Sequence, residues 1–479
     1  MRPFEIAIVC LVLSGLLAAR VFSRRAGAAL LAWLCGGLLA VAVALHLLLE
    51  GAHWQLGPQY LAVLVTMVLL LILDLGRRWK ITAALVVVLL VAASCGLSFV
   101  KPMFALPKPT GQFAVGSRIL EMTDSSRRED AVPGDAHPRE LVAQVWYPVS
   151  RETNDSNHHL APYRRLSETT WKNSHLSVVW TNSHLDAPVA SGQFPLLIYN
   201  PGWNGYRAQN TAIVEELASH GYIVVAIDHP YNSGPVEVAD GRVIQPVPTP
   251  QLSDDVTTAK DVYALIDAEV AKETTDAQFV LAQLKLMNKD GASPFYQRLD
   301  EARIGALGYS LGGAVAAELA LRDAAVKAVL DLDTPLYGEA GRRGVRQPFM
   351  LLSEEIPHST PEELARLSFG QRRDAEMDEG DYARQLPILR TAGSYQIALR
   401  GTLHTSFQDG ILMSPLPRFS GAGAIAPKRL ISILRQYTVA FFDQSLRGVA
   451  SPLLAAKASP FPEAEVLYSS TAPGGTPGK

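Results

Sequence analysis

The residues with the clearest chemical potential form a Gly-x-Ser-x-Gly motif at positions 308–312, centred on Ser310. A short apolar run at 303–307 precedes the motif, and an alanine-rich helical pattern at 314–321 follows it. This strand–turn–helix context is the one that a nucleophile elbow requires. Glycines flank the serine because the turn is too tight for a Cβ, and the serine itself is held under backbone strain. The pattern therefore predicts Ser310 as a nucleophile beside the positive N-terminus of a helix.

A serine hydroxyl is a poor nucleophile near neutral pH and needs a base, which in turn needs an orienting acid. In α/β-hydrolases the three residues follow the chain order serine, acid, histidine. Two histidines lie beyond the next predicted strand, His358 and His404. His404 follows a predicted strand ending at residue 399, whereas His358 begins a charged excursion. We therefore predict His404 as the base, with His358 as the alternative.

Two aspartates are candidates for the acid. Asp331 and Asp333 stand at the end of a predicted strand at 326–332 and alternate across Leu332, so they share one face while the strand lasts. Asp333 lies nearer the loop edge of the sheet, where ligands bind in folds of this class. We predict Asp333 as the acid and keep Asp331 as the alternative.

An oxyanion hole needs two backbone donors. The amide of Leu311, directly after the nucleophile, is predicted as one. The other is expected in the loop after a predicted strand at 195–199, where Gly202 allows the chain to turn its amides inward. We predict the amide of Trp203 as this second donor. A plain Pro-Gly turn is the alternative interpretation of the loop.

The elements that position these residues alternate between strand and helix patterns across 139–450. Apolar strand patterns occur at 142–147, 195–199, 222–227, 326–332, 348–352 and 394–399, and helical patterns lie between them and at 428–446. This alternation predicts an α/β fold, a mostly parallel sheet with helices on both faces, as the catalytic domain. Residues 101–138 are predicted as a linker. The Pro-, Gly- and Ser-rich stretch 451–479 is predicted as a poorly ordered tail.

The first hundred residues have a different character, and they account for the positive mean hydropathy of +0.12. Four apolar runs near 4–19, 26–49, 60–75 and 81–100 predict about four transmembrane helices. Lysine and arginine are concentrated at 20–25 and 77–80, and are absent from 50–59. By the positive-inside rule the basic loops face the cytoplasm. The sequence thus predicts a multi-pass membrane protein with an extracytoplasmic catalytic domain. His46 lies in the second run with no partner recognised at helical spacing.

Composition narrows the function further. The 479 residues carry a net charge of −3 and are 19% charged, so no basic surface suggests nucleic acid as a partner. The three cysteines, Cys10, Cys35 and Cys95, all lie in the apolar region. The catalytic domain therefore has no disulfide and no thiol nucleophile. His158 and His159 are adjacent in a polar loop without carboxylate partners, and we expect neither a metal nor a cofactor.

Four segments resemble the platelet-activating factor acetylhydrolase family of the plasma and isoform II type. They are residues 145–148, 194–203 with 217–222, 303–313, and 399–409, the last reading LRGTLHTSFQD. The resemblance covers about 110–450 and aligns Ser310, Asp333 and His404 with the family's nucleophile, acid and base. It implies a cofactor-free, calcium-independent serine esterase of the α/β-hydrolase fold. Such an enzyme removes short or oxidised acyl chains from phospholipids.

The chain departs from the family's pattern at two places near the expected acyl pocket. Asn200-Pro201 stands where the family commonly has histidine before glycine, and Tyr309 stands where it usually has histidine. These departures therefore leave the choice of substrate open, while the predicted ester hydrolysis by a serine nucleophile stays the same. One alternative is a carboxylesterase or dienelactone-hydrolase-like enzyme acting on small esters. The other is a catalytically silent hydrolase fold that serves as a membrane receptor or scaffold.

Overall fold

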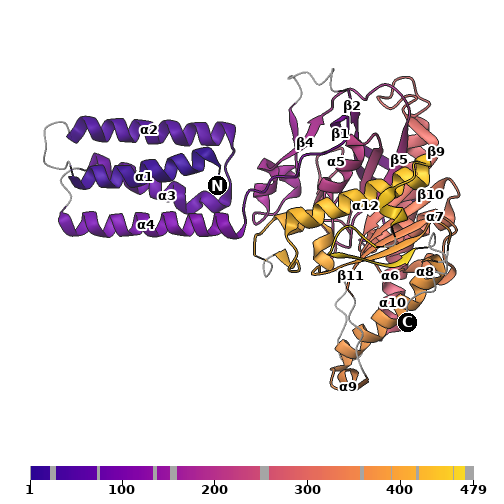
Figure 1. Cartoon of the computed structure of the whole chain (residues 1–479). Helices are drawn as coiled ribbons and strands as arrows, with labels where there is room; N and C mark the ends of the chain where they lie inside the picture. The colour runs from indigo at the N-terminus through magenta and orange to yellow at the C-terminus, as the bar shows by residue number, and fades with distance from the viewer. Residues whose placement is uncertain are drawn as a thin grey trace. The chain divides into compact units, whose positions relative to one another are not determined.

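The chain forms two compact units (Figure 1). The computed structural model describes residues 2–21, 28–72, 76–132, 137–150, 159–248, 258–355, 361–389, 391–416, 420–456 and 458–469. The first unit consists of Met1–Ala105, Pro162–Trp180 and Leu412–Ser420. The second consists of Leu106–Ala161, Thr181–Ile411 and Gly421–Lys479.

The first unit is a helical bundle. Its helices are α1 (Pro3–Val21), α2 (Ala28–Leu49), α3 (Gly57–Leu71) and α4 (Arg77–Val100), with the short turns η1 (Trp54–Leu56), η2 (Leu166–Glu168) and η3 (Ser174–Val178). Ile8, Leu39, Val63 and Val87 belong to one buried apolar cluster that joins all four helices. Large apolar side chains also face outward, which is the pattern of a helix with no polar side.

Three of the described helical segments are long and apolar enough to cross a membrane: Ala32–Leu49, Trp54–Leu71 and Arg77–Val100. The apolar stretch of α1, Pro3–Leu17, is shorter. Three of the four predicted transmembrane helices are therefore supported, whereas the apolar stretch of the first is shorter than a span usually requires.

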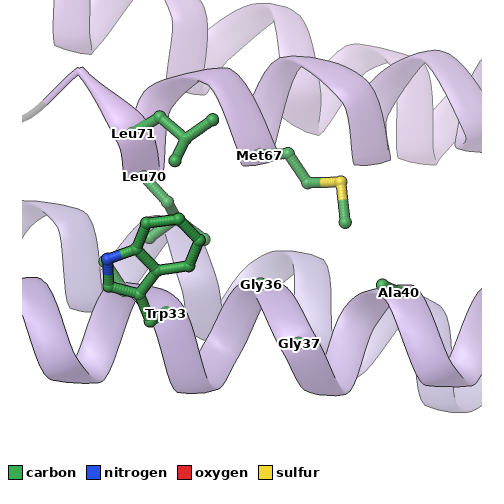
Figure 2. Close-up of a pocket in the computed structure, with 8 residues that line it drawn as sticks. Trp33, Gly36, Gly37, Ala40, Met67, Leu70 and Leu71 are labelled. Carbon is green, nitrogen blue, oxygen red and sulfur yellow. The ribbon is translucent and has the colours of Figure 1, made fainter.

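An apolar groove lies between α2 and α3 (Figure 2). It is lined by Ala32, Trp33, Gly36, Gly37, Ala40, Met67, Leu70 and Leu71. A Cβ added at Gly36 or Gly37 would meet no described heavy atom within 4 Å. This stretch of α2 is therefore left open rather than packed against a helix among the described residues.

The second unit is built on a twisted sheet. Eleven strands of the described residues pair in the order β13-β12-β11-β10-β9-β5-β6-β2-β1-β4-β3. Their bounds are β1 (Ala114–Arg128), β2 (Pro138–Val149), β3 (Leu160–Pro162), β4 (Trp180–Leu185), β5 (Phe194–Asn200), β6 (Ile223–Asp228), β9 (Leu299–Tyr309), β10 (Val326–Leu332), β11 (Phe349–Glu354), β12 (Tyr395–Leu399) and β13 (Ala464–Ser469). A separate ribbon pairs β7 (Val236–Glu237) with β8 (Val243–Ile244).

The six strands from β12 to β6 are parallel, and their register aligns the places where they end. In the β9–β10–β11 ladders, Leu332 lies opposite Tyr309 on one side and Leu352 on the other. Every residue of β5 and β6 is buried, as expected for strands covered on both faces. The loops that follow β9, β10 and β11 therefore leave the sheet side by side.

Helices cover the two faces of this sheet. On one face α5 (Thr211–Ser219) packs with α12 (Pro427–Arg447), which runs across the sheet in Figure 1. On the other, α6 (Ala259–Met287) packs with α7 (Leu311–Arg322) and α8 (Gly338–Arg343). The remaining helices are α9 (Pro361–Leu364), α10 (Phe369–Leu389) and α13 (Pro452–Ala455), with η4 (His404–Phe407) and η5 (Asp409–Leu412).

Three predicted boundaries are wrong. Residues 101–138 are not a linker, because β1 pairs with β2 from Ala114 onward, and its alternating exposed residues made it look polar. The predicted tail 451–479 contains β13, which pairs antiparallel with β12, while 470–479 lie outside the described residues. The catalytic domain predicted at 139–450 begins earlier, and two of its segments, Pro162–Trp180 and Leu412–Ser420, belong to the first unit.

Candidate active site

Ser310 occupies the sharp turn between β9 and α7. Its backbone has φ 54° and ψ −132°, a sparsely populated region for a residue with a side chain. The Ser310 amide donates to the carbonyl of Leu332 at 3.1 Å, and the Thr334 hydroxyl donates to the Ser310 carbonyl. The strained turn is thus fixed by hydrogen bonds to β10 and to the loop after it.

The glycines on either side of Ser310 are required by close backbone contacts. A Cβ on Gly308 would lie 2.0 Å from the carbonyl carbon of Gly312. A Cβ on Gly312 would lie 2.0 Å from the carbonyl oxygen of Asn200, in the loop after β5. Any side chain at these positions would have to displace backbone atoms. The turn and the β5 loop can approach each other only because both positions lack a side chain.

The structure brings three of the predicted site residues together. The Nε2 atom of His404 lies 2.8 Å from the Ser310 hydroxyl, and its Nδ1 atom lies 2.8 Å from Asp333 Oδ2. The three side chains come from the ends of β9, β10 and β12, which share one edge of the sheet. The alternative base His358 lies outside the described residues.

The two candidate acids have different surroundings. Asp333 follows β10 with φ 63°, and this turn directs its carboxylate to His404, while its Oδ1 accepts from the Glu354 amide at 2.7 Å. Asp331 is fully buried inside the strand, and burial raises the pKa of its carboxyl well above the usual range. No hydrogen bond joins Asp331 to His404 among the described contacts, whereas Asp333 makes one. The geometry therefore favours Asp333 over Asp331.

The imidazole of His404 is tuned by its neighbours. Burial alone would lower its pKa, but the hydrogen bond and charge of Asp333, together with the charge of Glu354, outweigh burial and raise the pKa above its ordinary value. The Tyr309 ring stacks on the imidazole at 5.1 Å between centroids, and its hydroxyl donates to the His404 carbonyl at 3.2 Å. Tyr309, which stands where the family usually has histidine, thus packs its ring against the predicted base His404.

The loop after β5 lies directly against the nucleophile. A Cβ on Gly202 would be 3.0 Å from Ser310 Cβ. The Gly202 amide donates to Gln209 Oε1 at 3.0 Å, so that amide is already engaged. The Trp203 side chain packs against the cluster that contains Leu311. Gly202 thus brings this loop beside Ser310, and the oxyanion roles of the Trp203 and Leu311 amides stay a prediction.

Polar residues that the sequence analysis did not single out tie this loop to the histidine loop. Gln209 Nε2 donates to Gln408 Oε1 at 2.9 Å, and the Asp409 amide donates to the Gln209 carbonyl at 2.9 Å. Asn210 Nδ2 donates to the Phe407 carbonyl at 2.7 Å. The sequence did show two consecutive amide side chains, Gln209 and Asn210, directly before a helix. It could not show their partners, which lie about 200 positions away.

Asp333, Glu354 and His404 also have the spacing of a possible metal group, with ligand atoms within 4.8 Å of one another. However, Nδ1 of His404 is hydrogen-bonded to Asp333, and Nε2 faces the Ser310 hydroxyl. This arrangement fits transfer of the serine proton better than ligation of an ion.

Comparisons with known families point in the same direction. The sequence profile described as platelet-activating factor acetylhydrolase, isoform II, matches residues 99–239. The profile of the dienelactone hydrolase family matches residues 183–348, which include Ser310 and Asp333. Each profile matches less than half of the chain.

Two curated relatives carry related names. A probable 1-alkyl-2-acetylglycerophosphocholine esterase from Arthroderma benhamiae is 27% identical over 283 residues, covering 53% of this chain and 66% of the relative. A platelet-activating factor acetylhydrolase from Cavia porcellus is 24% identical, covering 47% of this chain and 50% of the relative. The chain thus spans between about half and two thirds of the length of these relatives.

Among solved structures, a ferulic acid esterase from Streptomyces cinnamoneus is similar, with a TM-score of 0.58 and 28% identity. The match covers 76% of this chain and 99% of the esterase. Together with the dienelactone hydrolase profile and the mostly parallel sheet, it confirms the predicted α/β-hydrolase fold.

The close contact at Gly312 generates a prediction about stability. Gly312→Ala places its Cβ against the Asn200 carbonyl, so we expect the free energy of unfolding to fall by about 1–3 kcal/mol or more, as overpacking does. Gly291→Ala is the matched control, because a Cβ there meets nothing within 4 Å, and a change within about 0.5 kcal/mol is expected. Urea unfolding followed by tryptophan fluorescence measures both. Equal midpoints for the two variants would contradict the described contact.

Proposed function

We propose that this chain is a serine carboxylic ester hydrolase, with Ser310 as nucleophile, His404 as base and Asp333 as the orienting acid. The observation that carries the proposal is the unbroken pair of 2.8 Å contacts from Asp333 through His404 to a serine held at a strained turn. The esterase names of the relatives and of the structural neighbour support it.

The geometry permits an acyl-enzyme mechanism. His404 Nδ1 donates its hydrogen to Asp333, which leaves Nε2 free to accept the Ser310 proton as Oγ attacks the ester carbonyl. The amides of Leu311 and Trp203 stabilise the developing oxyanion. The imidazolium then gives its proton to the departing alkoxide. A water molecule, activated by the same Nε2 atom, hydrolyses the acyl-serine and restores the free enzyme.

For the substrate we propose short or oxidised acyl chains of phospholipids. The isoform II profile and the name of the Arthroderma relative support this choice. The dienelactone hydrolase profile supports the second candidate, an esterase of small soluble esters. Hydrolysis rates below and above the aggregation point of a short-chain phosphatidylcholine separate the two. A lipid-directed enzyme gains rate on aggregates, whereas a small-ester enzyme does not.

We further propose that the helical bundle anchors the enzyme in a membrane with the hydrolase unit on the extracytoplasmic side. The three long apolar segments support a multi-pass anchor. Arg77 and Arg78 begin α4 at one end of the bundle, while residues 50–59 at the other end carry no lysine or arginine. Protease added to intact cells should cleave the hydrolase unit. Cleavage restricted to permeabilised cells would contradict this orientation.

Substitution of the triad tests the catalytic roles. Ser310→Ala and His404→Ala should each lower kcat for p-nitrophenyl acetate by about 10³-fold or more, because the members of a triad act as a unit. Asp333→Asn should cause a large loss as well. Asp331→Asn is the matched control on the same strand and should retain most of the activity, since Asp331 does not touch the imidazole.

Each failure in this series has a definite meaning. Activity that survives Ser310→Ala would exclude Ser310 as the nucleophile. If Asp331→Asn loses activity and Asp333→Asn retains it, Asp331 would be the orienting acid in place of Asp333. A folded wild-type chain that hydrolyses no ester would favour the receptor or scaffold alternative.

The raised pKa of His404 predicts the pH dependence. Only the neutral imidazole accepts the serine proton, so kcat/KM should rise with pH through the pKa of His404 and level off above it. This midpoint should lie above that of an ordinary histidine, because Asp333 and Glu354 stabilise the charged form. Asp333→Asn removes the main stabilising partner and should move the midpoint of its residual activity to lower pH. An unchanged midpoint would contradict the assignment.

A further inference from the structure

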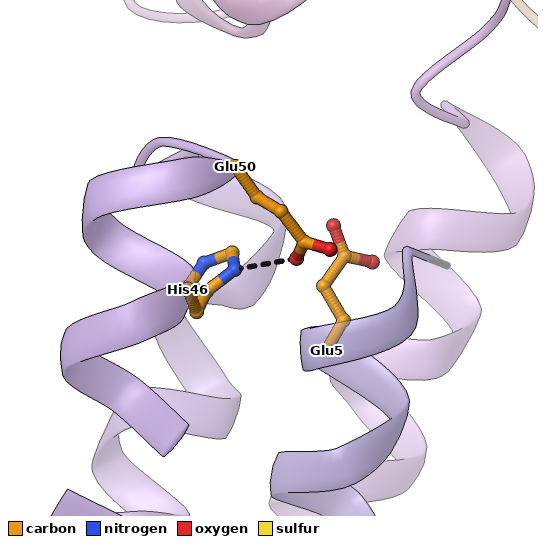
Figure 3. Close-up of side chains that lie close together, drawn as sticks. All are labelled: Glu5, His46 and Glu50. Carbon is orange, nitrogen blue, oxygen red and sulfur yellow. Dashed lines mark hydrogen bonds and ion pairs between the residues drawn. The ribbon is translucent and has the colours of Figure 1, made fainter. Parts of the chain in front are cut away.

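A group of ionisable side chains lies at the end of the bundle where α1 begins and α2 ends (Figure 3). Glu5 belongs to the first turn of α1, His46 to the last turn of α2, and Glu50 follows α2 directly. Each offers a ligand atom, and these atoms lie within 4.8 Å of one another. Glu5 and His46 are fully buried, and the Glu50 side chain is 10% exposed. The group therefore lies just beneath the surface at Glu50.

The sequence analysis missed this group. His46 does have a partner at helical spacing, because its Nδ1 atom lies 2.9 Å from Glu50 Oε2, four residues later. Glu50 lies beyond the apolar run, and Glu5 is far away in sequence. The convergence of the start of α1 with the end of α2 was therefore not visible in the sequence pattern.

Two buried carboxylates this close together need a positive charge to offset them. The guanidinium of Arg2 donates to the backbone carbonyls of Glu50 and Val178, rather than to either carboxylate among the described contacts. The carboxylates instead accept from backbone amides and histidines: Arg2 N to Glu5 Oε2, and Phe4 N to Glu50 Oε1. The charge of the Arg2 guanidinium acts on both carboxylates, but the guanidinium forms no hydrogen bond with either of them among the described contacts.

Outer partners hold the converging groups in position. The Tyr60 hydroxyl lies 2.8 Å from His46 Nε2, and His53 Nε2 lies 2.9 Å from Glu5 Oε1. Such outer hydrogen bonds orient imidazole and carboxylate ligands in metal sites. His46 Nδ1 and one oxygen of each glutamate lie within 4.8 Å of one another, and an ion bound there would replace the hydrogen bond between His46 and Glu50.

An unpaired oxygen belongs to Gln59, whose side chain contacts the backbone of Glu5. Gln59 is fully buried, and its Nε2 donates to the Glu5 carbonyl at 2.9 Å. Its Oε1 has no hydrogen-bond partner among the described residues. A buried acceptor without a donor is costly unless a cation or a bound molecule satisfies it.

We propose that Glu5, His46 and Glu50 bind one divalent transition-metal ion of the Zn²⁺ class, with Gln59 Oε1 as an adjacent oxygen donor. One imidazole nitrogen with carboxylate oxygens is a donor set that such ions accept, whereas Mg²⁺ and Ca²⁺ favour oxygen alone. The bound ion joins the start of α1 to the end of α2. The site shares no residue with the triad and does not depend on the proposed esterase function.

Binding breaks the hydrogen bond between His46 and Glu50, reverses the one between His46 and Tyr60, and changes the tautomer of His46. In the metal-free form Nδ1 carries the hydrogen donated to Glu50, and Tyr60 donates to Nε2. In the metal-bound form Nδ1 gives its lone pair to the ion, the hydrogen moves to Nε2, and that N–H donates to the Tyr60 oxygen. The imidazole stays neutral in both forms, so the ring loses no net proton.

The test uses the full-length chain in detergent micelles, stripped of metal with a chelator. Co²⁺ is titrated and followed by its visible d–d absorption, and Zn²⁺ is then added as a competitor. We expect one Co²⁺ per chain, displaced by Zn²⁺, and a rise in Tm with Zn²⁺. His46→Ala and Glu50→Gln should each weaken binding by at least about 10-fold, and Tyr60→Phe should weaken it to a similar or smaller extent.

His159→Ala is the matched control, because His159 is an exposed histidine outside the bundle group, and it should bind as wild type. Circular dichroism verifies that each variant is folded, and Glu50→Gln preserves the size of the side chain if His46→Ala fails this check. The proposal is overturned if the folded wild type binds no Co²⁺, if Mg²⁺ or Ca²⁺ binds instead, or if Glu50→Gln binds as tightly as wild type.

Discussion

The catalytic unit depends on a backbone contact that tolerates no side chain. The turn after β9 presses against the loop after β5 so closely that a Cβ on Gly312 would lie 2.0 Å from the Asn200 carbonyl oxygen. This contact sets the nucleophile beside the loop that carries Trp203, and it forces Ser310 into a left-handed conformation. The neighbouring parallel strands stabilise the strained backbone of Ser310. Their register aligns the ends of β9, β10 and β11.

The proposed base, His404, comes from a part of the chain that is distant from Ser310 in sequence. His404 lies 94 positions after Ser310, and its loop is tied to the loop after β5 through Gln209, Asn210 and Gln408. Asp333 holds one side of the imidazole and Tyr309 stacks on it. The proposed base and the proposed oxyanion donors therefore lie on two loops that are joined directly by hydrogen bonds.

The sequence alone predicted the structural features that depend on a local residue pattern. The sharp turn at Ser310, the buried strands and the convergence of Ser310, Asp333 and His404 were predictable because each follows from spacing, chain order or hydrophobic periodicity. The strand β1 was not, since its exposed alternate residues resemble a polar linker, and β13 was hidden among residues typical of loops. The grouping of His46 and Glu50 with Glu5 was missed because Glu50 lies beyond the apolar run and Glu5 comes from a different helix. The sequence favoured Asp333 over Asp331 because Asp333 lies nearer the loop, and their surroundings agree with this choice, since one carboxyl is buried in the strand and the other is turned toward His404.

The central claim, that Ser310 is an activated nucleophile, is tested most directly by covalent labelling. The folded full-length chain is treated with a fluorophosphonate, and its peptides are analysed by mass spectrometry. The account predicts a single phosphonyl adduct on the peptide that carries Ser310, with labelling strongly slowed in His404→Ala. An adduct on a different serine, or labelling of Ser310 at the same rate without His404, would contradict it.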